Sequence, residues 1–156
     1  MRIGTHEVGN GASTYVIAEM SANHAGDINR AKEIIHAAKE AGADCIKIQT
    51  YTPDTLTIDC DNKYFHISDG TWNGENLYKL YEKAYTPWEW QQELFNEAKK
   101  CGIDFFSTPF DKTAVDFLEK LGVGFYKIAS FEIVDIPLIE YVACLLYTSD
   151  AADDLI

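Results

Sequence analysis

Two lysines lie in short apolar runs that are typical of buried β-strands. The first, Lys47, stands in residues 45–50 (CIKIQT), two positions before Gln49. Because successive side chains of a strand point to opposite faces, Lys47 and Gln49 share one face, and Ile46 and Ile48 take the other. An enclosed lysine is costly unless it meets an anion, so Lys47 is a candidate for holding a phosphate or carboxylate. A lysine exposed on an edge strand is the simpler alternative.

Lys127 repeats this pattern near the end of another run, residues 124–129, and Ser130 follows it. Thr108 follows a third run, residues 103–107. If these strands are parallel, their carboxyl ends meet at one edge, and two lysines and two hydroxyls converge there. Lysines supply charge and hydroxyls supply directed hydrogen bonds, which together suit a phosphate group. The hydroxyls also fit helix caps and turns, which is the competing interpretation.

Two carboxylates and one histidine complete the candidate site. Glu19 ends an apolar run, and Glu132 lies shortly after Lys127. Beside lysines these carboxylates either do proton chemistry or form simple ion pairs. His24 lies in a turn-like segment, where it either contacts a substrate or orders the loop. The other histidines, His6, His36 and His66, show no ligand spacing, and we assign them no role.

The elements that must position these residues alternate between strands and helices. Asp27 and Asp111 are expected to cap helices at their N-termini, Thr86-Pro87 to begin another, and glycines to end all three. A long polar loop is expected at residues 51–75, followed by a short helix near 77–81. We expect strands at 14–18, 45–50, 103–107 and 124–129, and helices at 28–41, 86–100, 111–121 and from Ile136 onward.

This β-α order with helix-length spacers predicts an α/β fold with a parallel sheet. No glycine-rich phosphate loop follows any expected strand, so neither a Rossmann nor a P-loop site is indicated. Polar residues at the carboxyl ends of strands fit a (β/α)₈ TIM barrel, of which about four units would be the first half. They fit an open doubly wound sheet equally well.

Composition restricts the possible partners. The 156 residues carry 25 acids against 13 lysines and arginines, a formal net charge of −12, so nucleic acid is an unfavourable partner. No apolar run is long enough to cross a membrane, and no secretory signal is apparent. Four separated cysteines without a CxxC pair indicate reduced thiols and a cytoplasmic location.

Four motifs follow one another along the chain: EMSANHAG at 19–26, KIQTY at 47–51, FSTPF at 106–110 and YKIASFE at 126–132. Together they resemble the sialic acid synthase family over residues 1–143. Within that family, SANHAG and KIQTYTPD are most similar to the pseudaminic acid synthase branch, with the N-acetylneuraminate and legionaminic branches as alternatives.

The resemblance implies a (β/α)₈ barrel, a small C-terminal domain and a homodimer. It implies a reaction in which phosphoenolpyruvate condenses with an N-acetylated amino sugar, aided by a divalent metal such as Mn²⁺ that polarises the sugar aldehyde. The two metal histidines would lie beyond Ala143. Phosphoenolpyruvate would contact Lys47, Thr108, Lys127 and Ser130, while Gln49 and Glu19 would face the sugar and Glu132 would position or deprotonate water.

The tail at residues 144–156 resembles, when back-translated, a transposase adapter used to prepare sequencing libraries. We therefore expect the natural part of this sequence to end near Ala143 and to correspond to half of a barrel. Two other interpretations stay open: a class I aldolase with a Schiff-base lysine at Lys47 or Lys127, and a truncated fragment without activity.

Overall fold

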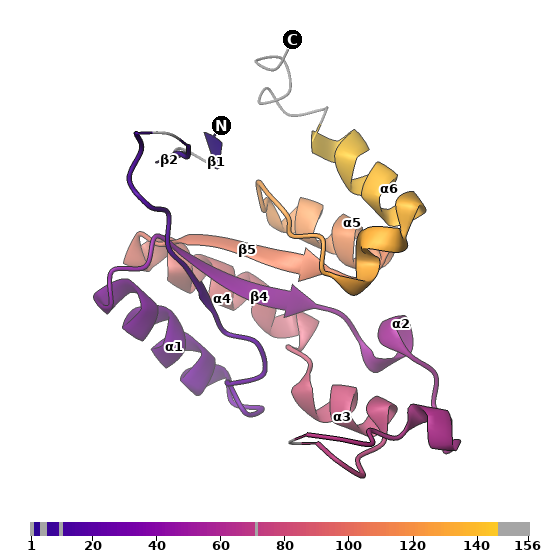
Figure 1. The fold of residues 1–156 in the computed structure, drawn as a ribbon. Coiled ribbons are helices and arrows are strands. Elements are labelled where there is room, and N and C mark those ends of the chain that lie inside the picture. The colour runs from indigo at the N-terminus through magenta and orange to yellow at the C-terminus, as the bar shows by residue number, and fades with distance from the viewer. Residues whose placement is uncertain (1, 4–5, 10, 71, 147–156) are drawn as a thin grey trace.

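The fold was analysed in a computed structural model that describes residues 2–3, 6–9, 11–70 and 72–146. Its centre is a parallel sheet in the order β3-β4-β5, made of Ile17–Glu19, Cys45–Thr50 and Asp104–Pro109. A short antiparallel pair, β1 (Arg2–Ile3) and β2 (His6–Glu7), stands apart from it (Figure 1). The parallel α/β arrangement predicted from the sequence is confirmed for the described residues.

Strand register decides which side chains share a face. Lys47 lies opposite Glu19 on β3 and Phe106 on β5, while Gln49 lies opposite Thr108. Ile46 and Ile48 are fully buried in the apolar core, and Lys47 and Gln49 lie on the opposite face of β4, which they share with the buried Cys45. The predicted division of this strand into an apolar and a polar face is confirmed.

Helices α1 (Ile28–Glu40), α4 (Trp88–Cys101) and α5 (Lys112–Leu121) pack against the strands, as Figure 1 shows. Asp27 and Asp111 cap α1 and α5 as predicted: the Asp27 carboxylate accepts from the Asn29 N–H, and the Asp111 carboxylate accepts from the N–H groups of Thr113 and Ala114. Gly102 ends α4 in the left-handed conformation, where a side chain would be strained.

The predicted capping of α4 by Thr86 is wrong, because Pro87 occupies the N-cap position. The Thr86 hydroxyl instead contacts the His24 ring, at 3.3 Å from Nε2. The Thr86 hydroxyl, which commonly caps a helix at such a position, therefore contacts the buried His24 instead of the first turn of α4.

The long segment between β4 and α4 contains more structure than its polar composition suggests. The short helix expected near 77–81 is present as α3 (Leu77–Ala84). Two further helical turns precede it, α2 (Pro53–Leu56) and the 3₁₀ turn η1 (Lys63–Phe65). Pro53 at the first position of α2 suits a helix start, because its missing N–H needs no partner there.

The predicted fourth strand at 124–129 is not formed as a strand. A single parallel bridge joins Tyr126 to Ser107, and the Lys127 N–H donates to the Ser107 carbonyl at 3.3 Å. Among the described residues this segment has a strand neighbour on one side only, so few ladder hydrogen bonds hold it extended. The 3₁₀ turn η2 (Phe131–Val134) and helix α6 (Ile136–Leu146) follow.

A buried polar network fastens α4 to the sheet. The Thr50 hydroxyl donates to the Gln91 amide oxygen at 2.8 Å and lies 2.6 Å from the Ser107 hydroxyl. All three residues are buried, so each polar atom must find a partner inside the protein. The network therefore fixes the ends of β4 and β5, from which the polar side chains project.

Replacing the cap residue Asp111 by alanine should loosen the first turn of α5. Loss of an N-cap costs about 1 kcal/mol, which corresponds to about fivefold faster amide exchange in that turn. Hydrogen exchange at Thr113 and Ala114, the amides that Asp111 accepts from, measures the effect. Asp111→Asn keeps the acceptor and should exchange like the wild type; equal rates in the alanine variant would contradict the assigned cap.

Candidate active site

The candidate site begins with a buried lysine. Lys47 is 3% exposed, and its Nζ lies 2.9 Å from Oε1 of Glu19, which is 55% exposed. The parallel register of β3 and β4 places these two residues side by side. An ammonium taken out of water needs this carboxylate, and the carboxylate keeps one side open to solvent.

A second ammonium approaches the first. Burial lowers the pKa of Lys47, the nearby ammonium of Lys127 lowers it further, and the Glu19 carboxylate opposes both effects. Two lysines separated by 80 positions in sequence are therefore brought together, on the face of the sheet that points away from the helices. Like charges at short range are unfavourable alone, and an anion with two negative charges would relieve them.

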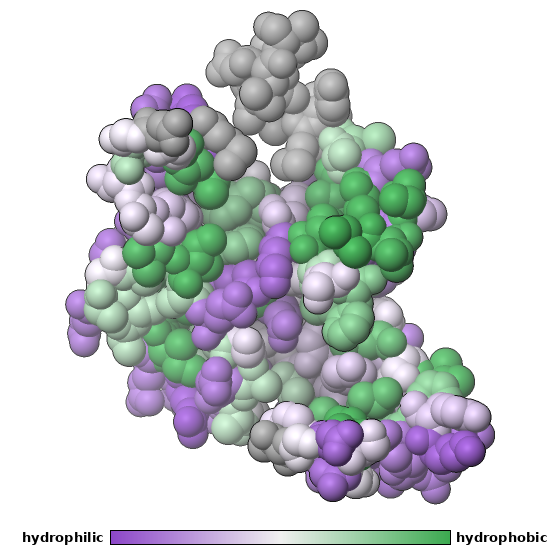
Figure 2. Space-filling view, viewed as in Figure 1, coloured by the Kyte–Doolittle hydropathy of each residue, from purple (hydrophilic) through white to green (hydrophobic). Residues whose placement is uncertain are grey.

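A pocket opens beside Lys127, which lines it, whereas Lys47, Glu19 and Thr108 are not among its lining residues. Its volume is about 460 Å³. Figure 2 shows hydrophilic side chains in the middle of this face of the molecule, next to a hydrophobic patch over the segment that leads into α6. The lining includes the predicted residues Gln49, Lys127, Ser130 and Glu132, together with Tyr51, Leu56, Tyr81, Phe110, Ala129 and Phe131.

Two polar atoms at this edge have no hydrogen-bond partner although they are buried. They are the hydroxyl oxygen of Thr108 and Oε2 of Glu132. Such groups usually cost about 1–3 kcal/mol each when left unsatisfied, so they point to a ligand that supplies the missing partner. Thr108 lies beside Gln49 in the strand register, and Glu132 lines the pocket itself.

The sequence did not single out the aromatic wall of the pocket. The Tyr51 ring meets Tyr81 and Phe110 edge to face, with ring centroids 5.8 Å and 5.4 Å apart. Burial raises the pKa of Tyr51 to about 12, so its phenol stays protonated at neutral pH. Tyr51 follows β4 directly, and this position in the sequence could have indicated that it lines the pocket, because the other predicted site residues also lie at strand ends.

His24 is placed differently from the other predicted residues. It is fully buried, accepts a hydrogen bond from the Gly26 N–H at 3.1 Å through Nδ1, and faces the Thr86 hydroxyl through Nε2. Its ring also packs edge to face on Trp90. These contacts order the loop around His24, which is one of the two roles that the sequence allowed. The other role, contact with a substrate, stays a prediction.

The residues present at the pocket do not by themselves fit a metal ion. Glu132 is the one carboxylate among the lining residues, with no histidine or cysteine beside it in that lining, and the Glu19 carboxylate is paired with Lys47. Within the described ranges, three potential ligand side chains come together at a different place, His36, Glu97 and Cys101.

Comparison with known proteins gives the family. A family model described as the NeuB family matches residues 34–147, so the chain belongs to this family. It is 52% identical over 128 residues to pseudaminic acid synthase of Helicobacter pylori, covering 82% of this chain and 38% of that protein. It is 36% identical over 135 residues to N,N'-diacetyllegionaminic acid synthase of Legionella pneumophila, covering 86% of this chain and 38% of that protein. The resemblance predicted from the four motifs is confirmed.

Solved structures agree with this assignment. An N-acetylneuraminic acid synthetase from Leptospira borgpetersenii, crystallised with citrate, superposes with a TM-score of 0.77 at 30% identity, covering 92% of this chain and 46% of that one. The Bacillus subtilis spore coat polysaccharide biosynthesis protein SpsE superposes with a TM-score of 0.71 at 32% identity, covering 93% and 37%. The chain thus spans less than half the length of these relatives.

The buried neutral His24 should make stability depend on pH. Burial lowers its pKa below that of the unfolded chain, so the unfolded state binds more protons once the pH falls below about 6.5. The free energy of unfolding should therefore decrease on going from pH 7 to pH 5. Urea unfolding followed by tryptophan fluorescence measures it, and His24→Gln should show a weaker decrease. The variant keeps His6, His36 and His66, so an identical decrease in both proteins would contradict this role.

Proposed function

We propose that the chain is the N-terminal half of a (β/α)₈ barrel. The parallel order β3-β4-β5, with a further bridge from β5 to Tyr126, supports successive strands added in sequence order. The pocket residues project from the carboxyl ends of these strands, where barrel enzymes carry their chemistry. The similarity to longer synthases, of which the chain covers 37–46%, supports the same conclusion.

The proposed activity of the whole protein is that of a nonulosonic acid synthase, a transferase in cell-surface glycan biosynthesis. It condenses phosphoenolpyruvate with an N-acetylated amino sugar and releases phosphate. The observation that carries this proposal is the convergence of Lys47 and Lys127, with the unsatisfied Thr108 hydroxyl two positions further along the register, opposite Gln49. Phosphoenolpyruvate, with a phosphate and a carboxylate, supplies the negative charge and the acceptor atoms that these groups lack.

The residues divide the work in a simple way. Lys47, Lys127, Thr108 and Ser130 hold the phosphate and carboxylate, and Gln49 and Glu19 face the sugar. The enol C3 of phosphoenolpyruvate attacks the aldehyde carbon of the open-chain sugar, and water adds to C2. Glu132 positions or deprotonates this water, and the resulting tetrahedral intermediate loses phosphate by cleavage of its C–O bond.

Among the branches of the family, we favour pseudaminic acid synthase. The chain is 50–52% identical to three pseudaminic acid synthases but 36–37% identical to two N,N'-diacetyllegionaminic acid synthases. Mouse N-acetylneuraminate-9-phosphate synthase is 33% identical. The homodimer, the cytoplasmic location and Mn²⁺ stay predictions from the resemblance. No helix in the described part of the chain has the length and apolar character to cross a membrane.

A class I aldolase is the second candidate, because the lowered pKa of Lys47 would favour the neutral amine that forms a Schiff base. Borohydride reduction of the full-length enzyme with a keto substrate distinguishes the two. We expect phosphate release from phosphoenolpyruvate and no trapped adduct. An adduct at Lys47 or Lys127 without phosphate release would favour the aldolase.

In the full-length enzyme, Lys127→Ala and Glu132→Gln should affect different kinetic constants. Removing the Lys127 ammonium should raise KM for phosphoenolpyruvate about 10- to 100-fold, since a charged hydrogen bond contributes about 1.5–3 kcal/mol. Removing the Glu132 carboxylate should lower kcat about 10²- to 10⁴-fold with less effect on KM. Steady-state phosphate release measures both. Lys120→Ala removes an exposed charge on α5 and should behave like the wild type; unchanged kinetics in both site variants would remove the assignment.

The chain by itself should be inactive and should self-associate. Four large apolar side chains of η2 and the start of α6 are exposed, Phe131, Ile133, Val134 and Ile136. Figure 2 shows a hydrophobic patch over this part of the molecule. A contiguous apolar patch of this kind marks a surface that another segment covers. Size-exclusion chromatography and a phosphate-release assay test this; a monodisperse monomer that unfolds cooperatively would count against it.

A further inference from the structure

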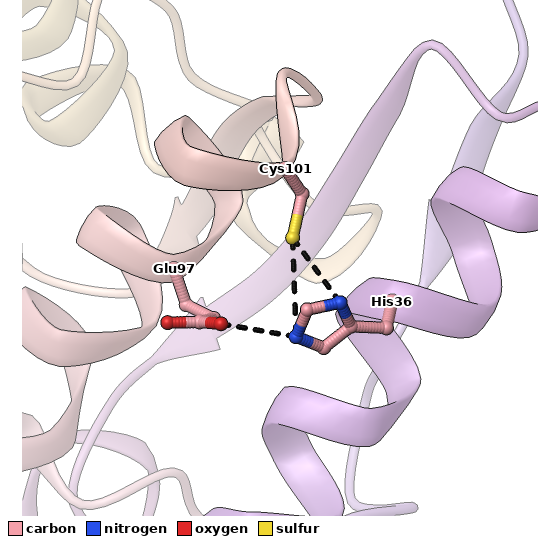
Figure 3. A group of neighbouring side chains, drawn as sticks. All are labelled: His36, Glu97 and Cys101. Atoms are coloured by element: carbon pink, nitrogen blue, oxygen red, sulfur yellow. Dashed lines mark hydrogen bonds and ion pairs between the residues drawn. The ribbon is translucent and has the colours of Figure 1, made fainter.

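We propose that His36, Glu97 and Cys101 bind one Zn²⁺ ion between helices α1 and α4. The three side chains converge from two helices on the outer layer of the fold, as Figure 3 shows. His36 has no ligand-like spacing in the sequence, because its partners Glu97 and Cys101 come from another helix. The ion would take an imidazole, a carboxylate and a thiolate as ligands.

Helix geometry explains why these residues meet. Glu97 and Cys101 are four positions apart on α4, which puts them on one face of that helix. Helix α1 runs alongside in the same direction, since Lys32 contacts Glu93 and, further along, the Lys39 ammonium reaches the Gly102 carbonyl. His36 lies between these two contacts on α1.

The distances between the candidate ligand atoms are close to those of a metal site. His36 Nε2 lies 3.0 Å from Glu97 Oε1 and 3.9 Å from Cys101 Sγ, and all three groups offer ligand atoms within 4.8 Å of one another. Tetrahedral zinc with bonds of about 2.0–2.3 Å separates its ligand atoms by about 3.3–3.6 Å. Small side-chain rotations convert the observed arrangement into such a site, with water as the fourth ligand.

The chemistry of the three groups selects the metal. Thiolate and imidazole prefer zinc to magnesium, calcium or manganese. Lys100 contacts Oε2 of Glu97 at 3.1 Å and leaves Oε1 directed at the histidine. A Zn²⁺ ion would be neutralised by one thiolate and one carboxylate.

This site is separate from the candidate active site. Helix α4 ends at Cys101 and leads through Gly102 into β5, so the cluster lies toward the amino end of the strands. The pocket lies at the carboxyl end. A metal here cannot reach the substrates, and its effect would be to hold α1 and α4 together. Because only the folded chain brings the three ligands together, zinc should raise the temperature of unfolding.

The same atoms also fit a reactive cysteine. Cys101 Sγ lies 3.4 Å from His36 Nδ1, and Glu97 faces the other ring nitrogen, as in an activated nucleophile with its base and orienting carboxylate. Metal binding is favoured because Sγ and Oε1 both lie within 4 Å of the same nitrogen, Nε2. The two possibilities are separable by experiment.

The test uses the 156-residue chain fused to a solubility partner that lacks cysteine and histidine, and purified without a polyhistidine tag. After chelator treatment under reducing conditions, the chain is titrated with Zn²⁺ against a chromophoric chelator. We expect one equivalent bound and a higher midpoint of thermal unfolding. Cys101→Ser, His36→Gln and Glu97→Gln should each weaken binding by at least about tenfold. Cobalt substitution should give thiolate charge-transfer absorption that Cys101→Ser loses.

Two matched controls keep the result interpretable. Cys60→Ser and Cys144→Ser remove thiols outside the cluster and should bind zinc like the wild type. Absence of a bound equivalent, or wild-type affinity in Cys101→Ser, would overturn the proposal. Alkylation of Cys101 that depends on His36, in a chain that takes up no zinc, would also overturn it and assign a reactive thiol. Circular dichroism verifies that each variant is folded, and none of these readouts depends on synthase activity.

Discussion

The ion pair between Lys47 and Glu19 is the interaction on which the candidate site depends. A lysine that is 3% exposed has lost nearly all its hydration, and a carboxylate at 2.9 Å compensates for that loss. The pair exists because β3 and β4 are parallel and in a register that sets these two residues side by side. A shift of one residue would turn Lys47 into the apolar core, so the register is strongly specified.

The contacts around this pair hold positively charged groups at one edge of the sheet. The Thr50–Gln91–Ser107 network fixes the strand ends, and Lys127 is brought close by the backbone hydrogen bond to Ser107. The result is an edge with two ammonium groups and buried polar atoms that lack partners. Such an edge is incomplete without an anion, and this incompleteness is the physical basis of the proposed phosphoenolpyruvate site.

The contacts between helices α1 and α4 differ from those at the candidate active site. The two helices meet through a row of polar contacts that begins at Lys32 and Glu93 and ends at Lys39 and Gly102. The proposed zinc site lies within this row, where an ion would stabilise the packing of two helices rather than a reaction. Chemistry and scaffold are thus divided between the two ends of the strands, as is usual for enzymes built on parallel sheets.

The segment from η2 to α6 has an exposed apolar part and a buried apolar part. Phe131 lies at the rim of the pocket and is exposed, while Leu138 and Val142 of α6 are buried against Val115 of α5. The helix is therefore anchored on its inner side, and the apolar surface is concentrated at the turn before it.

Local sequence determined most of the elements, because helix caps and strand alternation depend on residues close together in the chain. Asp27 and Asp111 marked two helix starts, and the spacing of Lys47 and Gln49 gave their common face. Predictions from the sequence were wrong or incomplete where residues distant in the chain decide the structure. The Thr86 hydroxyl contacts His24 rather than capping α4, and residues 124–129 have a strand neighbour on one side only among the described residues. The packing of Tyr51 on Tyr81 and Phe110 was not predicted. His36, Glu97 and Cys101 likewise became a group only when two helices packed. Tertiary structure alone decided these features, since the contacts join residues that no local pattern relates.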